Sequence, residues 1–315
     1  VMAENTVKKI ATRESYGNSL KELAEEFPNL VVLDADLAAA TKTGIFRKAY
    51  PDRHIDCGIA EENMMGVAAG LSLVGKIPFV SSFAMFAAGR AFEQVRNSIG
   101  YPHLNVKIGA THAGITVGED GATHQCNEDI ALMRTIPGMV VMCPSDDVEA
   151  RAAVRAALEY EGPVYIRFGR AAVPVINDHP GYHFEIGKGT VVREGKDVTI
   201  VATGICVDSA LGAAKMLEEE GISAEVVNIC TIKPLDEEII LNSAKKTGKV
   251  VTVEEHSVIG GLGSAVCDCL CAHYPVPVKK VGMQDVFGES GSAAALVEKY
   301  GLDAKGVYKS VKEFL

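Results

Sequence analysis

Short apolar runs alternate with longer amphipathic segments along the first half of the chain. The runs are rich in Val and Ile and end at Gly, Pro or Asp, as buried strands do. The spacing of apolar residues between them predicts helices, of which the clearest cover 14–26 and 147–160. This alternation indicates an α/β fold, a mostly parallel sheet with helices on both faces. The predicted strands are Leu30–Asp34, Pro78–Ser82, Val106–Ala110, Met139–Cys143 and Val164–Phe168.

Residues 171–196 interrupt this pattern, because they contain Pro174, Pro180 and several Gly without a helical period. A second alternating block follows. We therefore predict two α/β domains, residues 1–175 and 197–315, joined by a linker over 176–196. In the second block the pattern predicts strands over 198–202, 224–229, 250–254 and 278–281, and helices over 207–220, 236–247, 261–273 and 305–315.

The composition excludes several classes of protein. Of 315 residues, 48% are apolar and 23% are charged, which is typical of a globular chain. The chain lacks the run of about 18 apolar residues that a membrane span needs, and its net charge of −10 disfavours nucleic acid as a partner. The polar, acidic start does not resemble a secretion signal, so we expect a cytoplasmic protein with free thiols. Cys267, Cys269 and Cys271 point in different directions on a predicted helix, so we expect core thiols and no metal site.

Four segments of the first predicted domain carry unusual side chains at strand ends or helix starts. In the first segment, Glu61 and Glu62 open an apolar helix that extends to Leu73. The helix dipole favours acidic residues in a first turn, and this explains many such pairs. A partly buried carboxyl group could instead share a proton with a ligand nitrogen. The sequence pattern alone leaves both interpretations open.

The second segment places Phe83 and Phe86 after a strand, at a spacing that allows both rings to lie on one face. Core packing is the usual reason for such a pair, and stacking on a heteroaromatic ligand is the alternative. The fourth segment ends the last strand with Arg167 and Arg170, which suit either an anionic ligand or a surface salt bridge.

The third segment, residues 111–125, is the richest polar stretch of the chain. It contains His112, Asp120 and His124 among several Gly, directly after a predicted strand. Open α/β sheets bind their ligands at the carboxyl ends of strands, so we favour a functional loop over a merely solvated one. A later group of glycines at 260–263 lacks the spacing of a dinucleotide-binding loop and predicts a tight turn into a helix.

Taken together, these segments resemble the carboxyl-terminal half of transketolases. The resemblance covers essentially the whole chain and implies a pyrimidine-binding domain followed by the family's carboxyl-terminal domain. The stretches that carry it, in order, are Gly58-Ile59-Ala60-Glu61, Ser82-Phe83, Gly118-Glu119-Asp120-Gly121-Ala122-Thr123-His124-Gln125, Glu254-Glu255-His256 and Gly260-Gly261-Leu262-Gly263.

The resemblance implies that the first domain holds half of a thiamine diphosphate site. Glu61 would hydrogen-bond the aminopyrimidine ring and favour its imino tautomer. Phe83 and Phe86 would line the pyrimidine pocket, with Asp36 and Leu37 in a loop beside the cofactor.

The resemblance also implies substrate contacts on other loops. His124 would move protons to and from the substrate oxygens, and Asp120 would bind the hydroxyl next to the reacting carbonyl. The sugar phosphate would be held by His112, Arg170 and Arg13.

The sequence departs from the family pattern in three ways. Ala40 replaces a phosphate-contacting serine, and Gly89 replaces an aromatic residue near the pyrimidine pocket. The Gly-Asp-Gly and Asn-Asn motifs that bind diphosphate and magnesium do not occur. The resemblance therefore implies one subunit of a split transketolase, which transfers a two-carbon ketol unit between sugar phosphates. A separate amino-terminal subunit would bind the diphosphate and magnesium, in a heterotetramer whose two-fold core the carboxyl-terminal domain stabilises.

Three alternatives fit less well. The beta subunit of a 2-oxo acid dehydrogenase has a different histidine loop. A half of deoxyxylulose-phosphate synthase shares Ile-Ala-Glu and Thr-His-Gln, but the sequence Gly-Glu-Asp-Gly at 118–121 favours transketolase. A non-catalytic regulatory partner is disfavoured because Glu61, Asp120 and His124 are all present.

Overall fold

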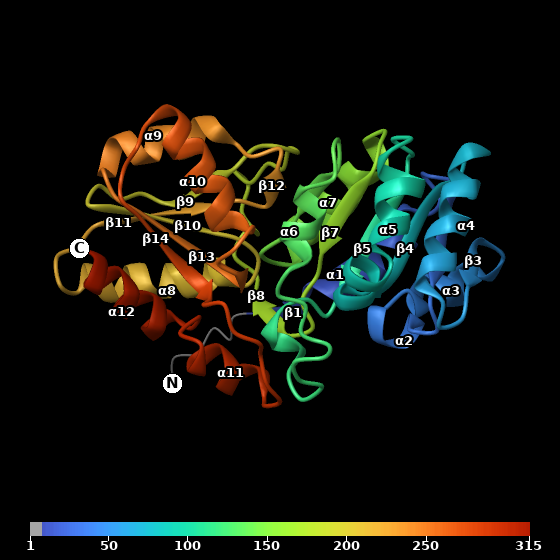
Figure 1. Cartoon of the computed structure of the whole chain (residues 1–315), viewed down its shortest axis with the longest axis horizontal. Helices are drawn as coiled ribbons and strands as arrows, with labels where there is room; N and C mark the ends of the chain where they lie inside the picture. The colour runs from blue at the N-terminus through green and yellow to red at the C-terminus, as the bar shows by residue number, and fades with distance from the viewer. Residues whose placement is uncertain (1–7) are drawn as a thin grey trace.

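The computed structural model describes residues 8–315 and contains two α/β units that lie side by side (Figure 1). Each unit is a mostly parallel sheet covered by helices. The fold class predicted from the alternation of strands and helices is therefore confirmed.

The first unit is built on a seven-stranded sheet whose central strands are buried on both faces. β2, β4, β5, β7 and β6 run parallel, and their register pairs Val32 with Phe79 and Val80 with Ile108. The carboxyl ends of these strands therefore meet at one edge of the sheet, where the site lies. In spatial order the strands are β12 (Thr231–Lys233), β6 (Val140–Met142), β7 (Val164–Arg167), β5 (Lys107–Thr111), β4 (Ile77–Phe83), β2 (Leu30–Asp34) and β3 (His54–Asp56).

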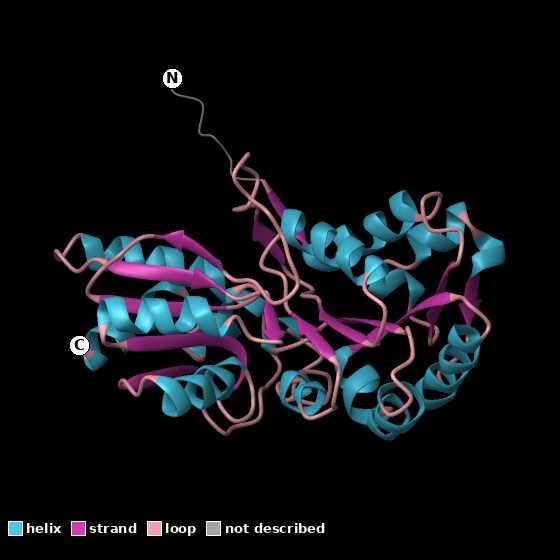
Figure 2. Cartoon of the chain, turned by 90° about the horizontal axis from the view of Figure 1, so that it is seen from above, coloured by secondary structure: helices cyan, strands magenta, loops and turns pink. Residues whose placement is uncertain are grey.

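Helices cover both faces of this sheet (Figure 2). Asp146 caps α7 by accepting a hydrogen bond from the Glu149 N–H. The segments η2 and η3 are π-helical. The helical segments are α1 (Thr12–Leu23), α2 (Ala38–Thr41), α3 (Gly44–Ala49), η1 (Pro51–Arg53), α4 (Glu61–Leu73), η2 (Met85–Arg90), α5 (Phe92–Gln94), η3 (Val95–Gly100), η4 (Ile115–Val117), α6 (Asp129–Arg134) and α7 (Asp147–Glu159).

The second unit is built on a five-stranded sheet in which β9 alone runs antiparallel. Glu254 accepts hydrogen bonds from the N–H groups of Leu262 and Gly263 and so caps α10. Gly260, with φ of 82°, makes the predicted turn into this helix. The elements are β9 (Thr190–Arg193), β10 (Val198–Ala202), α8 (Cys206–Glu218), β11 (Ala224–Asn228), α9 (Glu237–Thr247), β13 (Val250–Ser257), α10 (Leu262–His273), β14 (Val278–Met283), α11 (Ala293–Lys299) and α12 (Ala304–Phe314).

Two pairings join segments that are distant in sequence. β12 leaves the second unit and pairs antiparallel with β6, so it forms the edge of the first sheet. β1 (Lys9–Ala11) and β8 (Ala172–Pro174) form a separate antiparallel ribbon.

The core fixes the elements from which the site residues extend. Tyr16 of α1 is fully buried and stacks on Phe168, with 4.6 Å between ring centroids. Its ring also packs on Gly109 of β5, where a Cβ atom would lie 2.4 Å from the Tyr16 ring. The close approach holds α1, which carries Arg13, against β5, which His112 follows, so the two side chains meet at the same point.

The structure contains elements that the sequence pattern did not predict. The three-residue strands β1, β3, β8 and β12 are too short to show a period, and β9 lies within 176–196. On α10, Cys269 is buried, Cys267 is half-buried and Cys271 is exposed. The prediction of core thiols is wrong for Cys271, because successive cysteines face different sides of the helix. Within residues 8–315, no helix combines the length and apolar character needed to cross a membrane.

Candidate active site

The side chains singled out in the sequence extend from the carboxyl ends of four parallel strands. Asp36 and Leu37 follow β2, Phe83 and Phe86 end and follow β4, and His112 follows β5. Arg170 follows β7. The edge of a parallel sheet is the usual ligand site of an open α/β fold.

Glu61 is the first residue of α4, and only 1% of its surface is exposed, whereas Glu62 is exposed. One carboxylate oxygen of Glu61 accepts a hydrogen bond from Ser82 Oγ at 3.3 Å. The other accepts one from Arg90 Nη1 at 2.8 Å. Of the two interpretations left open by the sequence, the burial of Glu61 agrees with the enclosed carboxyl group, and the exposure of Glu62 agrees with a solvated first-turn residue.

Arg90 is a site residue that the sequence analysis missed. Its guanidinium group lies 4.5 Å from the centre of the Phe86 ring while it bonds Glu61. A planar group with N–H donors thus lies between a carboxylate and an aromatic face. An aminopyrimidine makes the same two kinds of contact, so these residues fit the pyrimidine part of thiamine diphosphate. The four-residue spacing of Phe86 and Arg90 was the available signal.

Four rings form one cluster beside this carboxylate. Phe83 stacks on His112 with 3.9 Å between ring centroids and on Phe86 with 6.0 Å. His124 lies edge-on to Phe86 at 5.5 Å and to Phe83 at 6.4 Å. His124 is half-buried, and its Nδ1 atom is 2.9 Å from Thr123 Oγ1. The structure therefore brings together the two histidines of the 111–125 loop and both phenylalanines.

His112 is neutral, and its hydrogen bonds define its tautomer. Nε2 lies 3.0 Å from Arg13 Nη1, which can only donate, so Nε2 is an acceptor. Nδ1 therefore carries the proton and faces Thr111 Oγ1 at 2.8 Å. Burial, followed by the charges of Arg13, Arg170 and Lys42, lowers the pKa of His112 to about 3. His112 is thus held neutral first by burial and then by the nearby positive charges.

Positive charge is concentrated around Arg13. Burial and the neighbouring Arg170 lower the pKa of Arg13. Arg13 Nη1 donates to the Ala40 carbonyl at 3.0 Å, while its Nε is buried without a hydrogen-bond partner in the part of the chain the structure describes. Lys42, which the sequence analysis missed, adds a cation two residues after Ala40. Three cations and an orphaned donor are the features of a site for an anion.

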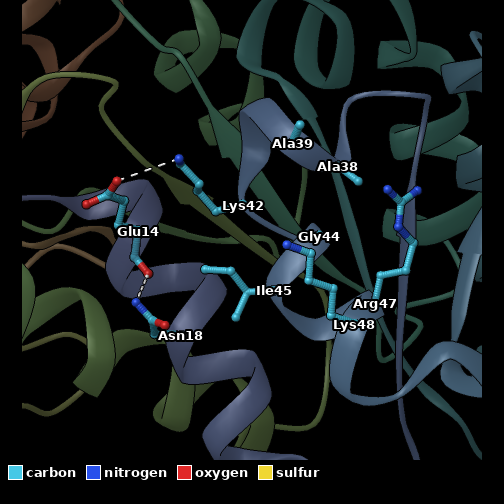
Figure 3. Close-up of a pocket in the computed structure, with 9 residues that line it drawn as sticks. All are labelled: Glu14, Asn18, Ala38, Ala39, Lys42, Gly44, Ile45, Arg47 and Lys48. Carbon is cyan, nitrogen blue, oxygen red and sulfur yellow. Dashed lines mark hydrogen bonds and ion pairs between the residues drawn. The ribbon is translucent and has the colours of Figure 1, made fainter.

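A cavity of about 420 Å³ lies beside these cations, between α1 and the α2–α3 segment (Figure 3). Lys42 extends from one wall toward Glu14, whose Oε1 lies 3.6 Å from Lys42 Nζ. Arg47 and Lys48 extend from the other side. The charged residues of the lining are three cations, Lys42, Arg47 and Lys48, and one carboxylate, Glu14, so the lining carries a net positive charge.

The tip of the 111–125 loop is exposed at Glu119 and Asp120. Arg170 Nη1 donates to Glu119 Oε2 at 3.0 Å and to the Val117 carbonyl. Of the two roles considered for Arg170, the structure shows the salt bridge, and Arg170 stands close enough to Arg13 and His112 to lower their pKa values.

The loop after β2 is fixed by two hydrogen bonds from its backbone to carboxylates, one part-buried and one exposed. Leu37 N–H donates to Asp34 Oδ1 at 3.2 Å, and Asp36 N–H donates to Asp56 Oδ1 at 3.1 Å. Asp36 itself is exposed and has φ of 60°. Leu37 and Asp36 are thereby presented at the sheet edge on which the ring cluster lies.

Between residues 8 and 315 the structure shows no group of three or more His, Cys, Asp or Glu side chains that could hold a metal ion.

Comparison with known proteins agrees with this geometry. Residues 8–175 match the family "Transketolase, pyrimidine binding domain", and residues 187–307 match "Transketolase, C-terminal domain". The fold and site thus define a transketolase-type pair of domains, and the chain belongs to the transketolase family. Dependence on thiamine diphosphate is general in this family of transferase enzymes.

Three relatives have nearly the same span as this chain. It is 52% identical over 303 residues to the "Putative transketolase C-terminal section" of Methanocaldococcus jannaschii, covering 96% of this chain and 95% of that protein. It is 49% identical over 301 residues to the "6-deoxy-6-sulfo-D-fructose transketolase subunit SqwH" of a Clostridium species, covering 96% and 93%. A solved structure, "Split gene transketolase, inactive beta4 tetramer", matches with 58% identity and a TM-score of 0.89, covering 97% of this chain and 98% of that one.

Proposed function

We propose that this chain is the carboxyl-terminal subunit of a two-subunit transketolase, which transfers a two-carbon ketol unit from a ketose phosphate to an aldose phosphate. The observation that carries the proposal is the buried Glu61 carboxylate, held beside the Phe86 face by the planar guanidinium group of Arg90. The guanidinium group faces one aromatic ring while it pairs with the carboxylate, and an aminopyrimidine would make the same two kinds of contact with Phe86 and Glu61.

Bound thiamine diphosphate supplies the electron sink that allows a carbon–carbon bond next to a carbonyl to break and re-form. In this chain, Glu61 would hold the proton at the pyrimidine ring nitrogen, and Phe83 and Phe86 would line the ring. The diphosphate and magnesium would be bound by a separate amino-terminal subunit. This division of the cofactor site between two subunits is supported by three relatives that have nearly the span of this chain. Their names describe a section, a subunit and a split-gene product.

His124 and Asp120 would act on the substrate oxygens. His124 Nδ1 faces Thr123 Oγ1, which leaves Nε2 to exchange a proton with a hydroxyl or carbonyl oxygen above the ring cluster. Asp120 lies four residues earlier on the exposed tip of the same loop, where it can accept a hydrogen bond from a substrate hydroxyl.

The anionic end of the sugar would bind where Arg13, Lys42 and Arg170 surround the neutral His112. Ala40 offers no hydroxyl here, and its carbonyl is instead used by Arg13. Lys42 would supply the contact that Ala40 lacks. The name of the Clostridium relative describes a sulfo-sugar substrate, which is also anionic, and this supports an anion site without fixing the sugar.

The proposal is tested by reconstitution. This chain, its separately expressed amino-terminal partner and their mixture are each assayed with thiamine diphosphate, magnesium, xylulose 5-phosphate and ribose 5-phosphate. We expect turnover in the mixture alone. Turnover by this chain alone would refute the two-subunit arrangement. If the mixture used pyruvate or branched 2-oxo acids and left xylulose 5-phosphate unchanged, the transketolase assignment would be wrong.

A further inference from the structure

The 111–125 loop is held in place by the second unit of the chain. Its two ends come together at Gly114 N–H and the Cys126 carbonyl, which are 2.9 Å apart, and at the bridge between Ala113 and Cys126. The two ends of the loop are thus joined, and its orientation depends on the contacts that the residues between them make with the rest of the chain.

The first contact is made by Glu255, at the end of β13. Its side chain is 3% exposed, and Oε1 accepts a hydrogen bond from the Thr116 N–H at 2.6 Å. The carboxylate also packs on Gly114, where a Cβ atom would lie 2.4 Å from it. A residue 139 positions later in the chain thus packs against the loop at Gly114 and Thr116.

Arg167 links Glu255 to the other end of the loop. Its Nη2 atom donates to the Glu255 carbonyl at 2.7 Å and to the Cys126 carbonyl at 3.3 Å. Its Nε atom donates to Asp129 at 2.9 Å, and Asp129 also accepts from the Tyr165 hydroxyl. Every one of these charged groups is buried, so the cluster is rigid and each member is satisfied by the others.

The second contact is made by the segment 288–291. Gln125 Nε2 donates to the Glu289 carbonyl at 2.9 Å and to two carbonyls of its own loop. Gly288 lies so close to Gln125 that an added Cβ atom would be 1.9 Å from Gln125 Oε1. The loop is therefore held on both sides by the second unit.

We propose that Glu255 is a positioning residue, through which the carboxyl-terminal unit fixes the loop that carries His112, Asp120 and His124 against the ring cluster. The catalytic consequence rests on the function proposed above, whereas the ordering of the loop does not. The carboxyl-terminal unit then contributes to each turnover and not only to assembly.

Three variants test this. Glu255→Ala removes the acceptor of the Thr116 N–H, and Glu255→Gln restores an oxygen acceptor without the charge that faces Arg167. Glu225→Ala is the matched control, because Glu225 is an equally buried carboxylate of the same sheet whose partners are Thr199 and Lys246. Gly288→Ala perturbs the second contact at a half-buried position whose φ lies outside the left-handed region. This variant keeps the test open if Glu255→Ala does not fold.

Amide hydrogen exchange of residues 111–125 is measured in the full chain, with and without the partner subunit. We expect roughly tenfold faster exchange in Glu255→Ala, a smaller effect in Glu255→Gln, and none in Glu225→Ala. In the reconstituted enzyme, kcat should fall on the order of 10- to 100-fold with Glu255→Ala, while the Kd for thiamine diphosphate stays unchanged.

Loop exchange that is the same in Glu255→Ala, Gly288→Ala and Glu225→Ala would overturn the proposal, since the second unit would then only stabilise the fold. If the loop loosens but the wild-type complex has no transketolase activity, the proposed function fails and the positioning role stands.

Discussion

Glu61→Ala should remove most of the activity while leaving the fold nearly intact. The Arg90 side chain that pairs with Glu61 is 43% exposed, so the ion pair contributes about 0–1 kcal/mol to stability. The first-turn charge adds about 0.3–1 kcal/mol. Together the two terms give a loss of about 0.3–2 kcal/mol, which lowers Tm by only a few degrees. Loss of an acid–base group costs about 10²–10⁴-fold in rate, which is roughly 3–5 kcal/mol of barrier.

The assay compares Glu61→Ala with Glu62→Ala in the complex reconstituted with the amino-terminal subunit. Glu62 is the exposed neighbour in the same first turn, so its substitution removes the same helix-end charge without touching the site. Steady-state kcat, thermal unfolding and thiamine diphosphate affinity by calorimetry are measured for both variants. We expect similar small changes in Tm, and a loss of kcat confined to Glu61→Ala.

Equal kcat in the two variants would refute the reasoning, because a carboxylate that does no more than pair with Arg90 could be removed without loss of rate. A large fall in Tm for Glu61→Ala alone would instead show that burial of the carboxylate contributes more to folding than its exposed partner indicates.

Two further predictions concern the anion site. Lys42→Met should raise KM for a phosphorylated ketose roughly 5- to 30-fold with kcat unchanged, because the contact binds the ground state and the transition state equally. KM for an uncharged ketose should not change. An equal rise in KM for both ketoses would exclude Lys42 from the anion site. The pKa of His112 is lowered from 6.5 to about 3 in the folded chain, so His112 of the unfolded chain is protonated first as the pH falls. The contribution of neutral His112 to stability is therefore complete above about pH 6.5 and declines as the pH falls toward 3. Between pH 7 and pH 5, the free energy of unfolding of His112→Gln should fall by about 2 kcal/mol less than that of the natural chain, as measured by urea unfolding. If the free energies of unfolding of the two proteins change in parallel with pH, His112 is not neutral and buried.

Much of the fold could be predicted because the central strands are apolar runs that are buried on both faces. β2 and β10 are buried along their whole length and coincide with the predicted ranges. β12 could not be predicted in the same way, because its three residues become a strand only by pairing with β6 of the other unit. Tertiary contact, and not local sequence, defines such an element.

The residues of the candidate site also divide into those marked by local sequence and those that depend on tertiary contacts. Glu61, Phe83, Phe86 and the histidine loop are marked by local sequence, and the structure brings them together; their roles remain proposals. Lys42 and Glu255 were missed because their significance depends on elements far away in the sequence. Glu255 lies in a stretch that carried the family resemblance, yet nothing near it in sequence shows that its carboxylate bonds the Thr116 N–H.

The pairing of β12 with β6 limits where this polypeptide could be divided. Thr231 and Lys233 cover the edge of β6, whose three residues are all buried. A chain ended near residue 175 would leave that edge with unpaired backbone groups, which is a template for aggregation. A gene division between the two units would therefore expose the β6 edge of the first sheet. This pairing favours the inheritance of the two units as one polypeptide.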